Sequence, residues 1–308
     1  KLKTLPALVT FFGGVAYLLN FAVLPNHIMG IVGQTAFDAI DFRATLMAVE
    51  TGLGVSFTVV YAIQNRDKII LHGKEWVWFA AAIVGILLAT TPCYTFQLFF
   101  DVNKYAYHPL DMNQTHRLLI YPAVLIPIAM YLVLKDLPDE SKRFALMYYA
   151  WMGLLNFSLE VKFNNFSGNH WVTAFPLHLC STAMYVTPLC LTFKWKKLFY
   201  FTYFINVLGA FLALAMPNYG DGATVFSQEV WRFYFNHYQA FFMPLLIVGL
   251  GMFRRPRWKE FGYSMVAFAV YFVAMLVINA WFSNYNPDVN YFFLNNDFIP
   301  KKFGVWGD

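Results

Sequence analysis

The stretch GYSMVAFAVYFVAMLVINAWFS at residues 262–283 decides the fold class of this chain. It contains 22 residues and no charged side chain, and about 20 apolar residues in a helix suffice to cross a hydrocarbon core of roughly 30 Å. Because backbone N–H and C=O groups in lipid must be paired within their own segment, we expect a helix here and not a strand. The basic cluster RRPRWK at 254–259 precedes the stretch, as a cytoplasmic anchor does.

Similar apolar runs recur along the chain of 308 residues, of which 59% are hydrophobic and only 13% charged. A soluble domain carries about a quarter charged residues, so this composition leaves too little polar surface for a soluble protein. We therefore predict an all-α polytopic transmembrane helical bundle of about nine helices. The expected spans are 4–24, 44–63, 76–99, 116–134, 144–160, 174–193, 198–216, 234–253 and 262–283.

The distribution of Lys and Arg predicts the orientation of these helices. With the N-terminus inside, the inner segments together carry 15 of these residues and the outer segments 7, which is the asymmetry that the positive-inside rule describes. The C-terminal tail, 284–308, is then expected outside, in a multi-pass protein of the cell membrane. Since the positive charges lie in short loops between apolar runs, the net charge of +5 does not indicate a nucleic-acid partner.

Under this topology, six of the seven histidines lie at or near the outer face. Three of them, His116, His178 and His237, fall within about two turns of the outer ends of three different spans. They could converge on one cavity that opens outward, as residues from facing helices do in bundle sites. Histidine is both the side chain most easily poised for proton transfer near neutral pH and the commonest metal ligand, so both chemistries are open at this point.

Polar residues inside the expected spans add further candidates. An ionisable group in the membrane costs several kcal/mol unless it has a partner, so a functional role is a reasonable default for it. For Glu50, a buried structural partnership explains the residue equally well. For Asn and Thr, an interhelical hydrogen bond worth under about 2 kcal/mol is the simpler explanation. The residues concerned are Glu50, Thr51, Asn156, Glu160, Asn206 and Asn279.

The stretch FPLHLCST at 175–182 is the most informative for function, because it offers an imidazole, a thiol and two hydroxyls. A thiol needs a lowered pKa or an adjacent base to attack an ester, and His237 on another helix could supply that base. Positions two apart on a helix point about 200° apart, so His178 and Cys180 share a face only if the helix is irregular, which Pro176 favours. Otherwise His178 shares its face with Ser181 and Thr182. In the plainer alternative, Cys180 is a small buried apolar residue.

The same stretch resembles the Leu-Pro-Leu-His-Leu-Cys signature of the bacterial YwaF-like integral membrane proteins. Three further matches follow in order at 203–218, at 233–239 around His237, and at NYFFL, 290–294. The resemblance covers about 111–308 and implies a six-helix core there, which leaves 1–110 as an N-terminal three-helix membrane module.

The YwaF-like group is itself similar to two eukaryotic kinds of membrane enzyme. These are the androgen-induced fatty-acid-ester hydrolases and a transmembrane phospholipid acyltransferase, in which the nucleophile and a His lie on different helices. Carried over by position, the resemblance implies Cys180 as the nucleophile and His237 as its base.

These observations favour a lipid acyl hydrolase or acyltransferase that acts at the outer leaflet through a Cys/His pair. Cys180 would attack a lipid ester with His237 as base and then acid, and His178 or His116 would orient a group or stabilise the oxyanion. We expect membrane lipids as partners and neither a cofactor nor a metal. The expected substrate-binding residues are His116, Asn156, Glu160, Ser181, Asn236 and Glu50.

Three other classes of protein stay open. A metal enzyme could use His116, His178 and His237 as ligands, together with Glu160. A transporter, or a receptor for a small ligand or lipid, could place Glu50 and Glu160 in an outward-facing polar cavity. A scaffold or assembly partner is the third, and the oligomeric state is open in every case.

Overall fold

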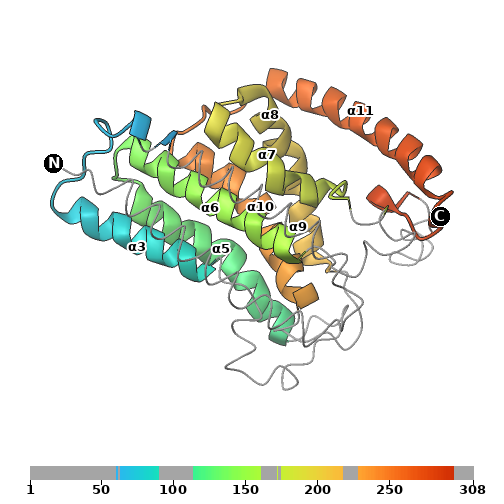
Figure 1. Ribbon diagram of the computed structural model, residues 1–308, viewed down its shortest axis with the longest axis horizontal. Coiled ribbons are helices and arrows are strands. Elements are labelled where there is room, and N and C mark those ends of the chain that lie inside the picture. Colours follow the sequence, from blue (N-terminus) through green and yellow to red (C-terminus); the bar gives the residue numbers. More distant parts are fainter. Residues whose placement is uncertain are drawn as a thin grey trace.

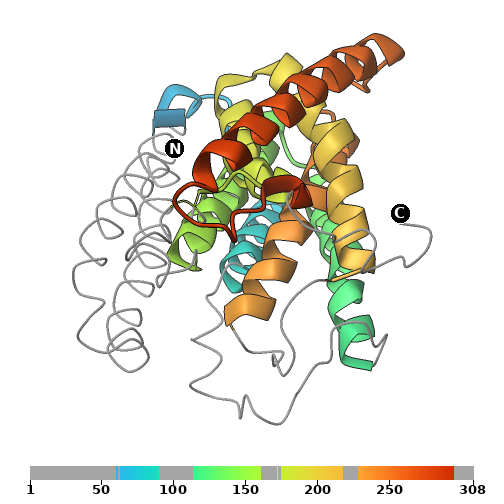
Figure 2. The ribbon, with the colours of Figure 1, turned by 90° about the vertical axis from the view of Figure 1, so that its right-hand side faces the viewer.

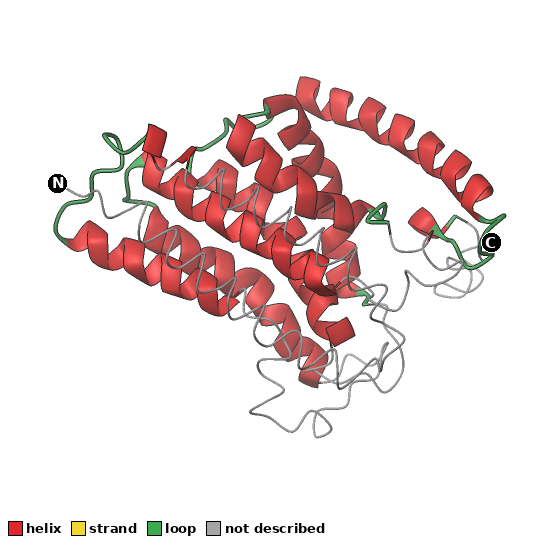
Figure 3. Cartoon of the chain, viewed as in Figure 1, coloured by secondary structure: helices red, strands yellow, loops and turns green. Residues whose placement is uncertain are grey.

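The computed structural model describes residues 60–61, 63–89, 114–160, 172, 175–217 and 228–294, and the fold is given for these residues. Every regular element among them is a helix (Figure 3), which confirms the all-α prediction. The elements are α3 (Lys74–Ala89), α5 (Gln114–Leu134), α6 (Asp139–Glu160), α7 (Leu179–Phe193), α8 (Lys196–Phe201), η5 (Thr202–Asn206), α9 (Val207–Ala215), α10 (Gln228–Gly249), α11 (Trp258–Phe282) and η6 (Tyr291–Phe293).

Each of the seven expected spans from 76–99 onward overlaps one of these helices or a run of them. The span expected at 198–216 is a composite, in which the π-helix η5 joins α8 to α9. Within the described residues, two helical stretches are long and apolar enough to cross a membrane, Lys196–Ala215 and Trp258–Phe282. The expected span 4–24 and nearly all of 44–63 lie outside the described residues.

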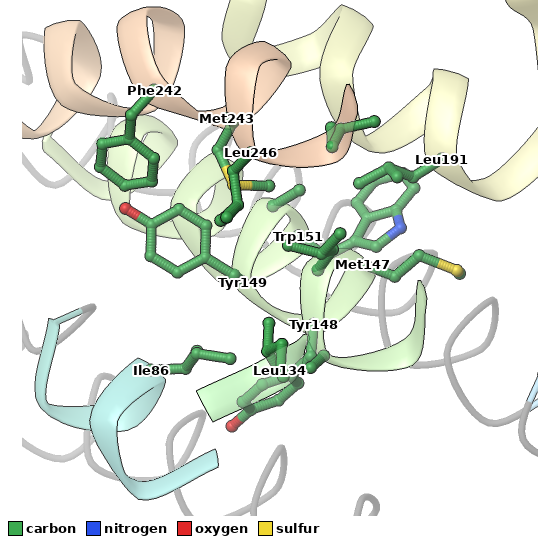
Figure 4. Packing of buried hydrophobic residues seen from close by; sticks show 14 of the residues in the cluster. Ile86, Leu134, Met147, Tyr148, Tyr149, Trp151, Leu191, Phe242, Met243 and Leu246 are labelled. Atoms are coloured by element: carbon green, nitrogen blue, oxygen red, sulfur yellow. The ribbon is translucent and has the colours of Figure 1, made fainter. Parts of the chain in front are cut away.

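The core forms around α6, which packs against α3, α7 and α10 (Figure 1). Phe144 to Ala150 are buried on every side of this helix, as expected for a helix that is apolar all round and surrounded by others. Tyr149 lies between two rings of α10, with ring centroids 6.2 Å from Phe235 and 5.8 Å from Phe242. Figure 4 shows this contact between α6 and α10 from close by.

The last long helix, α11, lies at the edge of the bundle (Figures 1 and 2). Its valines at 266, 270, 273 and 277 are exposed, and among the described elements it mainly contacts α8, η5 and η6. An apolar helix whose side chains face outward in this way is suited to a lipid environment.

Arg143 ties the start of α6 to the ends of two other helices. Its guanidinium donates to the carbonyl oxygens of Leu191 (3.3 Å) and Met252 (3.4 Å) and lies 5.8 Å from the centroid of the Phe253 ring. Cations are favourable near the carboxyl ends of helices, where carbonyl groups lack intrahelical donors. The buried guanidinium of Arg143 therefore joins the start of α6 to the end of α7 and to the turn after α10.

Three alanines bring α7, α9 and α10 close together. Ala183, Ala210 and Ala240 are wholly buried in one cluster, and small residues let helix backbones approach closely. Ala183 lies one turn after Cys180 in α7, and Ala240 lies one turn after His237 in α10. The close crossing therefore lies directly beside the two residues on which the functional hypothesis depends.

Candidate active site

Cys180 is the second residue of α7. The helix begins at Leu179, because His178 has an extended backbone (φ −68°, ψ 145°) and acts as the N-cap. The first intrahelical bond runs from the N–H of Thr182 to the carbonyl of His178, at 3.1 Å. Backbone N–H groups in the first turn of a helix have no intrahelical acceptor and attract negative charge, so the sulfur lies where a thiolate is favoured.

The thiol of Cys180 and the imidazole of His237 lie close enough to interact electrostatically. His237 comes from α10, and its Nδ1 lies 2.5 Å from the carbonyl oxygen of Phe233, one turn earlier in the same helix. A carbonyl oxygen only accepts, so Nδ1 must carry the proton of the neutral ring. In the neutral ring Nε2 then carries no proton, which is the form that a general base requires.

Ser181 and Thr182 complete the polar start of α7. Ser181 directly follows Cys180, and its side chain is buried. The hydroxyl of Thr182 donates to the carbonyl of Leu179 at 2.7 Å and accepts from Nδ2 of Asn206 at 3.5 Å. Asn206 belongs to the π-helix η5, and π-helical turns are frequent at functional sites. It makes the interhelical hydrogen bond that its sequence position predicted.

His178 precedes the first helical residue, so the angular argument that separated it from Cys180 does not apply. Its ring packs against Tyr291, with centroids 5.2 Å apart. His116 is wholly buried in α5, and its Nδ1 lies 2.7 Å from the hydroxyl of Tyr234 in α10.

The three histidines do not form a metal site. Across the described part of the chain, no group of three or more His, Cys, Asp or Glu side chains could hold a metal ion. The three-histidine metal enzyme that the sequence left open is therefore not supported by the positions of His116, His178 and His237.

A second set of polar side chains lies on α10 on either side of His237 in the sequence, three positions apart. Asn236 and Gln239 are buried, and among the described residues no hydrogen-bond partner is found for Oδ1 of Asn236 or for either amide atom of Gln239. Gln239 packs against Gly153 of α6 so closely that a Cβ there would lie 2.0 Å from Oε1. Asn236 was predicted as a site residue, but Gln239 was not. The sequence did offer an indication for Gln239, because its amide lies three positions after Asn236 in an otherwise apolar span.

The remaining predicted residues cannot be placed. Asn156 and Glu160 belong to α6, but their side chains, like Glu50 as a whole, lie outside the described part of the structure.

Two tyrosines that the sequence reasoning missed contact the segment before α7. The hydroxyl of Tyr271 donates to the carbonyl of Leu177 (2.8 Å), and that of Tyr291 donates to the carbonyl of Val172 (2.6 Å). Tyr291 lies in the matched NYFFL stretch, which was noted only for the resemblance. An aromatic hydroxyl in an apolar span or next to it was the available signal, because a buried Tyr usually finds a partner for its O–H.

An all-helical apolar bundle with a thiol–imidazole pair between two of its helices defines a membrane protein with a candidate nucleophile. The family model that matches the chain is that of the TMEM164 family, over residues 74–306. The chain therefore belongs to the TMEM164 family, a family of transmembrane proteins. No curated protein and no solved structure matches it. The family match begins with α3, and the division into 1–110 and 111–308 stays a prediction.

Proposed function

We propose that this protein is a membrane-embedded lipid acyl hydrolase or acyltransferase that works through a thioester on Cys180. The observation that carries the proposal is that the Cys180 thiol lies beside the imidazole of His237, whose Nδ1 is hydrogen-bonded to the carbonyl of Phe233. A nucleophile next to a base that is oriented by a third group is the recurring arrangement of covalent acyl transfer.

In the first half-reaction, Nε2 of His237 takes the thiol proton as the sulfur attacks the carbonyl carbon of a lipid ester. The new C–S bond gives a tetrahedral oxyanion. When this collapses, the C–O bond to the leaving alcohol breaks, and the imidazolium returns its proton to the alcohol oxygen. In the second half-reaction, His237 takes a proton from water or from the hydroxyl of an acceptor lipid as that oxygen attacks the thioester carbonyl. The C–S bond then breaks, and the imidazolium returns the proton to the sulfur of Cys180.

The oxyanion is stabilised by the start of α7. The first-turn N–H groups and the positive end of the helix dipole lie beside Cys180, and donors aimed at developing charge are usually the largest single contribution to such catalysis. His178 directly before the helix, and His116 with Asn236 further into the bundle, are the proposed substrate-contacting residues.

Further features of the proposal concern the membrane. We place nine spans with the amino end inside, in a multi-pass protein of the cell membrane, which puts the start of α7 near the outer leaflet. The support is the count of 15 inner against 7 outer Lys and Arg. The similarity of 111–308 to YwaF-like proteins, and through them to ester hydrolases and an acyltransferase, favours acyl chemistry on membrane lipids.

The decisive experiment tests the two cysteines of α7 side by side. Purified protein in nanodiscs of phosphatidylcholine and phosphatidylethanolamine is assayed for lipid turnover, and a hydroxylamine-sensitive acyl adduct is sought by intact mass. Cys180→Ser should lose the adduct and nearly all turnover, and His237→Ala should lower turnover by roughly 10²–10⁴-fold. Cys190→Ser is the matched control, because this wholly buried cysteine lies ten residues further along the same helix. Full lipid turnover in both site variants would eliminate the proposal.

A transporter or ligand-binding protein is the second candidate, and one observation favours it. Asn236 and Gln239 present amide atoms without partners inside a bundle where such atoms cost about 1–3 kcal/mol each. A polar ligand held between α6 and α10 would satisfy them. Reconstituted protein would then bind or take up a small polar solute without lipid breakdown, and Gln239→Met would abolish this; lipid breakdown without solute binding would exclude it.

A further inference from the structure

The segment that leads into α7 is held by two tyrosine hydroxyls from far along the chain. Tyr271 of α11 reaches the carbonyl of Leu177, three residues before Cys180. Tyr291 of η6 reaches the carbonyl of Val172. Each bond joins positions about a hundred residues apart in sequence, so the last part of the chain is fastened to the start of the helix that carries the thiol.

Tyr291 is itself fixed by an amide of α11. Its backbone N–H donates to Oδ1 of Asn279 at 2.9 Å, and Nδ2 of Asn279 donates to its carbonyl at 2.7 Å. Asn279 is only 1% exposed, and one side chain that satisfies both polar groups of a residue determines where that residue lies. Asn279 therefore serves the turn after its own helix, and not another helix as its place in a span predicted.

The next residue, Phe292, shows how strongly this turn is determined. Its backbone is left-handed, with φ 62°, a conformation that bulky residues rarely adopt and that persists only where the surroundings impose it. Its ring packs on α11, with centroids 5.4 Å from Tyr271 and 6.1 Å from Phe268. The two tyrosines thus belong to one rigid unit.

This unit lies directly against the candidate active site. Tyr291 packs on the ring of His178, and Tyr271 lies close enough to Cys180 for the two groups to interact electrostatically. Figure 1 shows α11 along the edge of the bundle, and the chain after it folds back so that η6 packs against α11. Besides its packing on α8, η5 and η6, α11 is joined to the segment before α7 by the Tyr271 hydroxyl bond and by the ring contact between Phe282 and Phe175, with centroids 5.8 Å apart.

We propose that Tyr271 and Tyr291 are positioning residues, which hold the first turn of α7 so that the Cys180 thiol meets His237 and the N–H groups of that turn face the oxyanion. The proposal rests on the thioester mechanism above. If the Tyr271 hydroxyl is lost, the Leu177 carbonyl has lost its donor, and the peptide between Leu177 and His178 is free to rotate. That rotation would change the backbone of the N-cap residue and hence the direction of the first turn. Substrate binding elsewhere in the bundle would not change.

The test uses Tyr271→Phe and Tyr291→Phe, each of which removes one oxygen atom. Tyr263→Phe is the matched control, because Tyr263 lies on the same helix and is 57% exposed. We expect the rate constant for acylation of Cys180 in a single turnover to fall at least about 10-fold in both site variants. KM should stay within about twofold, and the control should match the wild type. The proposal would be overturned if Tyr263→Phe showed the same loss of rate as the two site variants. It would also be overturned if Cys180 in Tyr271→Phe were acylated at the wild-type rate.

A second measurement separates this inference from the proposed function. The rate at which iodoacetamide alkylates Cys180 reports the environment of the thiol whether or not the protein turns over lipid. If the wild type forms no acyl adduct, the thioester mechanism fails, but the alkylation rate still tests the positioning role. An alkylation rate that changes in Tyr271→Phe and not in Tyr263→Phe supports the positioning role. Equal alkylation rates in the wild type and both variants refute it. Should either Phe variant fail to fold, the same measurement is made on Asn279→Asp. This variant keeps the oxygen that accepts from the Tyr291 N–H and removes the NH₂ group that donates to the Tyr291 carbonyl.

Discussion

At the scale of single residues, the orientation of His237 depends on its own helix. The carbonyl of Phe233 fixes the proton on Nδ1, so Nε2 of the neutral ring carries none. The sequence predicted the pairing of Cys180 with His237 from residue chemistry and from resemblance, and the structure brings the two side chains together. It could not predict the carbonyl partner, because every helical residue has a carbonyl four positions earlier and only the side-chain rotamer decides whether it is used.

The contact between Gly153 and Gln239 predicts a stability effect at a single position. Gly153→Ala would place a methyl group 2.0 Å from Oε1 of Gln239, and overpacking of this kind costs about 1–3 kcal/mol. We expect a lower thermal unfolding temperature in detergent, which the double variant with Gln239→Ala restores in part. Gly85→Ala in α3 is the control, since a Cβ there meets nothing within 4 Å. Equal melting temperatures for Gly153→Ala and the wild type would contradict the contact.

At the scale of elements, hydropathy predicted which segments are helical but not where they begin or what interrupts them. In the span expected from 174, the helix begins at Leu179, and residues 175–178 are not helical. Pro176 accounts for this in part, because the residue before a proline disfavours the helical conformation. That shift moved His178 out of the helix and removed the apparent conflict with Cys180. The π-helix η5 was not predicted either, since one extra residue in a turn leaves the apolar composition of a span unchanged.

The crossing of α7, α9 and α10 predicts how far the site depends on helix spacing. Ala240→Leu adds bulk where three wholly buried alanines meet, so α10 must move away from α7 and take His237 out of reach of Cys180. We expect lipid turnover to fall at least about 10-fold, with a protein that still folds. Ala267→Leu on the outward face of α11 is the control and should retain turnover. An Ala240→Leu protein with wild-type acylation would show that the pair tolerates separation of the helices.

At the scale of the whole molecule, composition alone excluded a soluble protein, and the family match agrees with that conclusion. The described helices from α3 onward were predictable because apolar runs and their basic flanks are strong signals. The positions of Tyr271 and Tyr291 against the start of α7 were not, since contacts between residues about a hundred positions apart leave no periodic pattern in a single sequence.

The proposed orientation can be tested by labelling from outside the cell. A membrane-impermeant maleimide should react with Asp288→Cys in intact cells, because the turn after α11 is placed outside. Lys135→Cys, between α5 and α6, should react only after permeabilisation, with the unaltered protein as the background control. Labelling of Lys135→Cys alone in intact cells would reverse the orientation and move the thiol to the inner leaflet.

The backbone partner of His237 has a consequence for any mutational survey of this protein. Where a side-chain carboxylate orients a catalytic imidazole, replacing that carboxylate exposes it as a third essential position. Here the orienting group is a peptide oxygen, which every substitution at Phe233 preserves as long as the helix stays intact. If the protein carries out the proposed reaction, a complete substitution scan would reveal two indispensable side chains, although three groups take part.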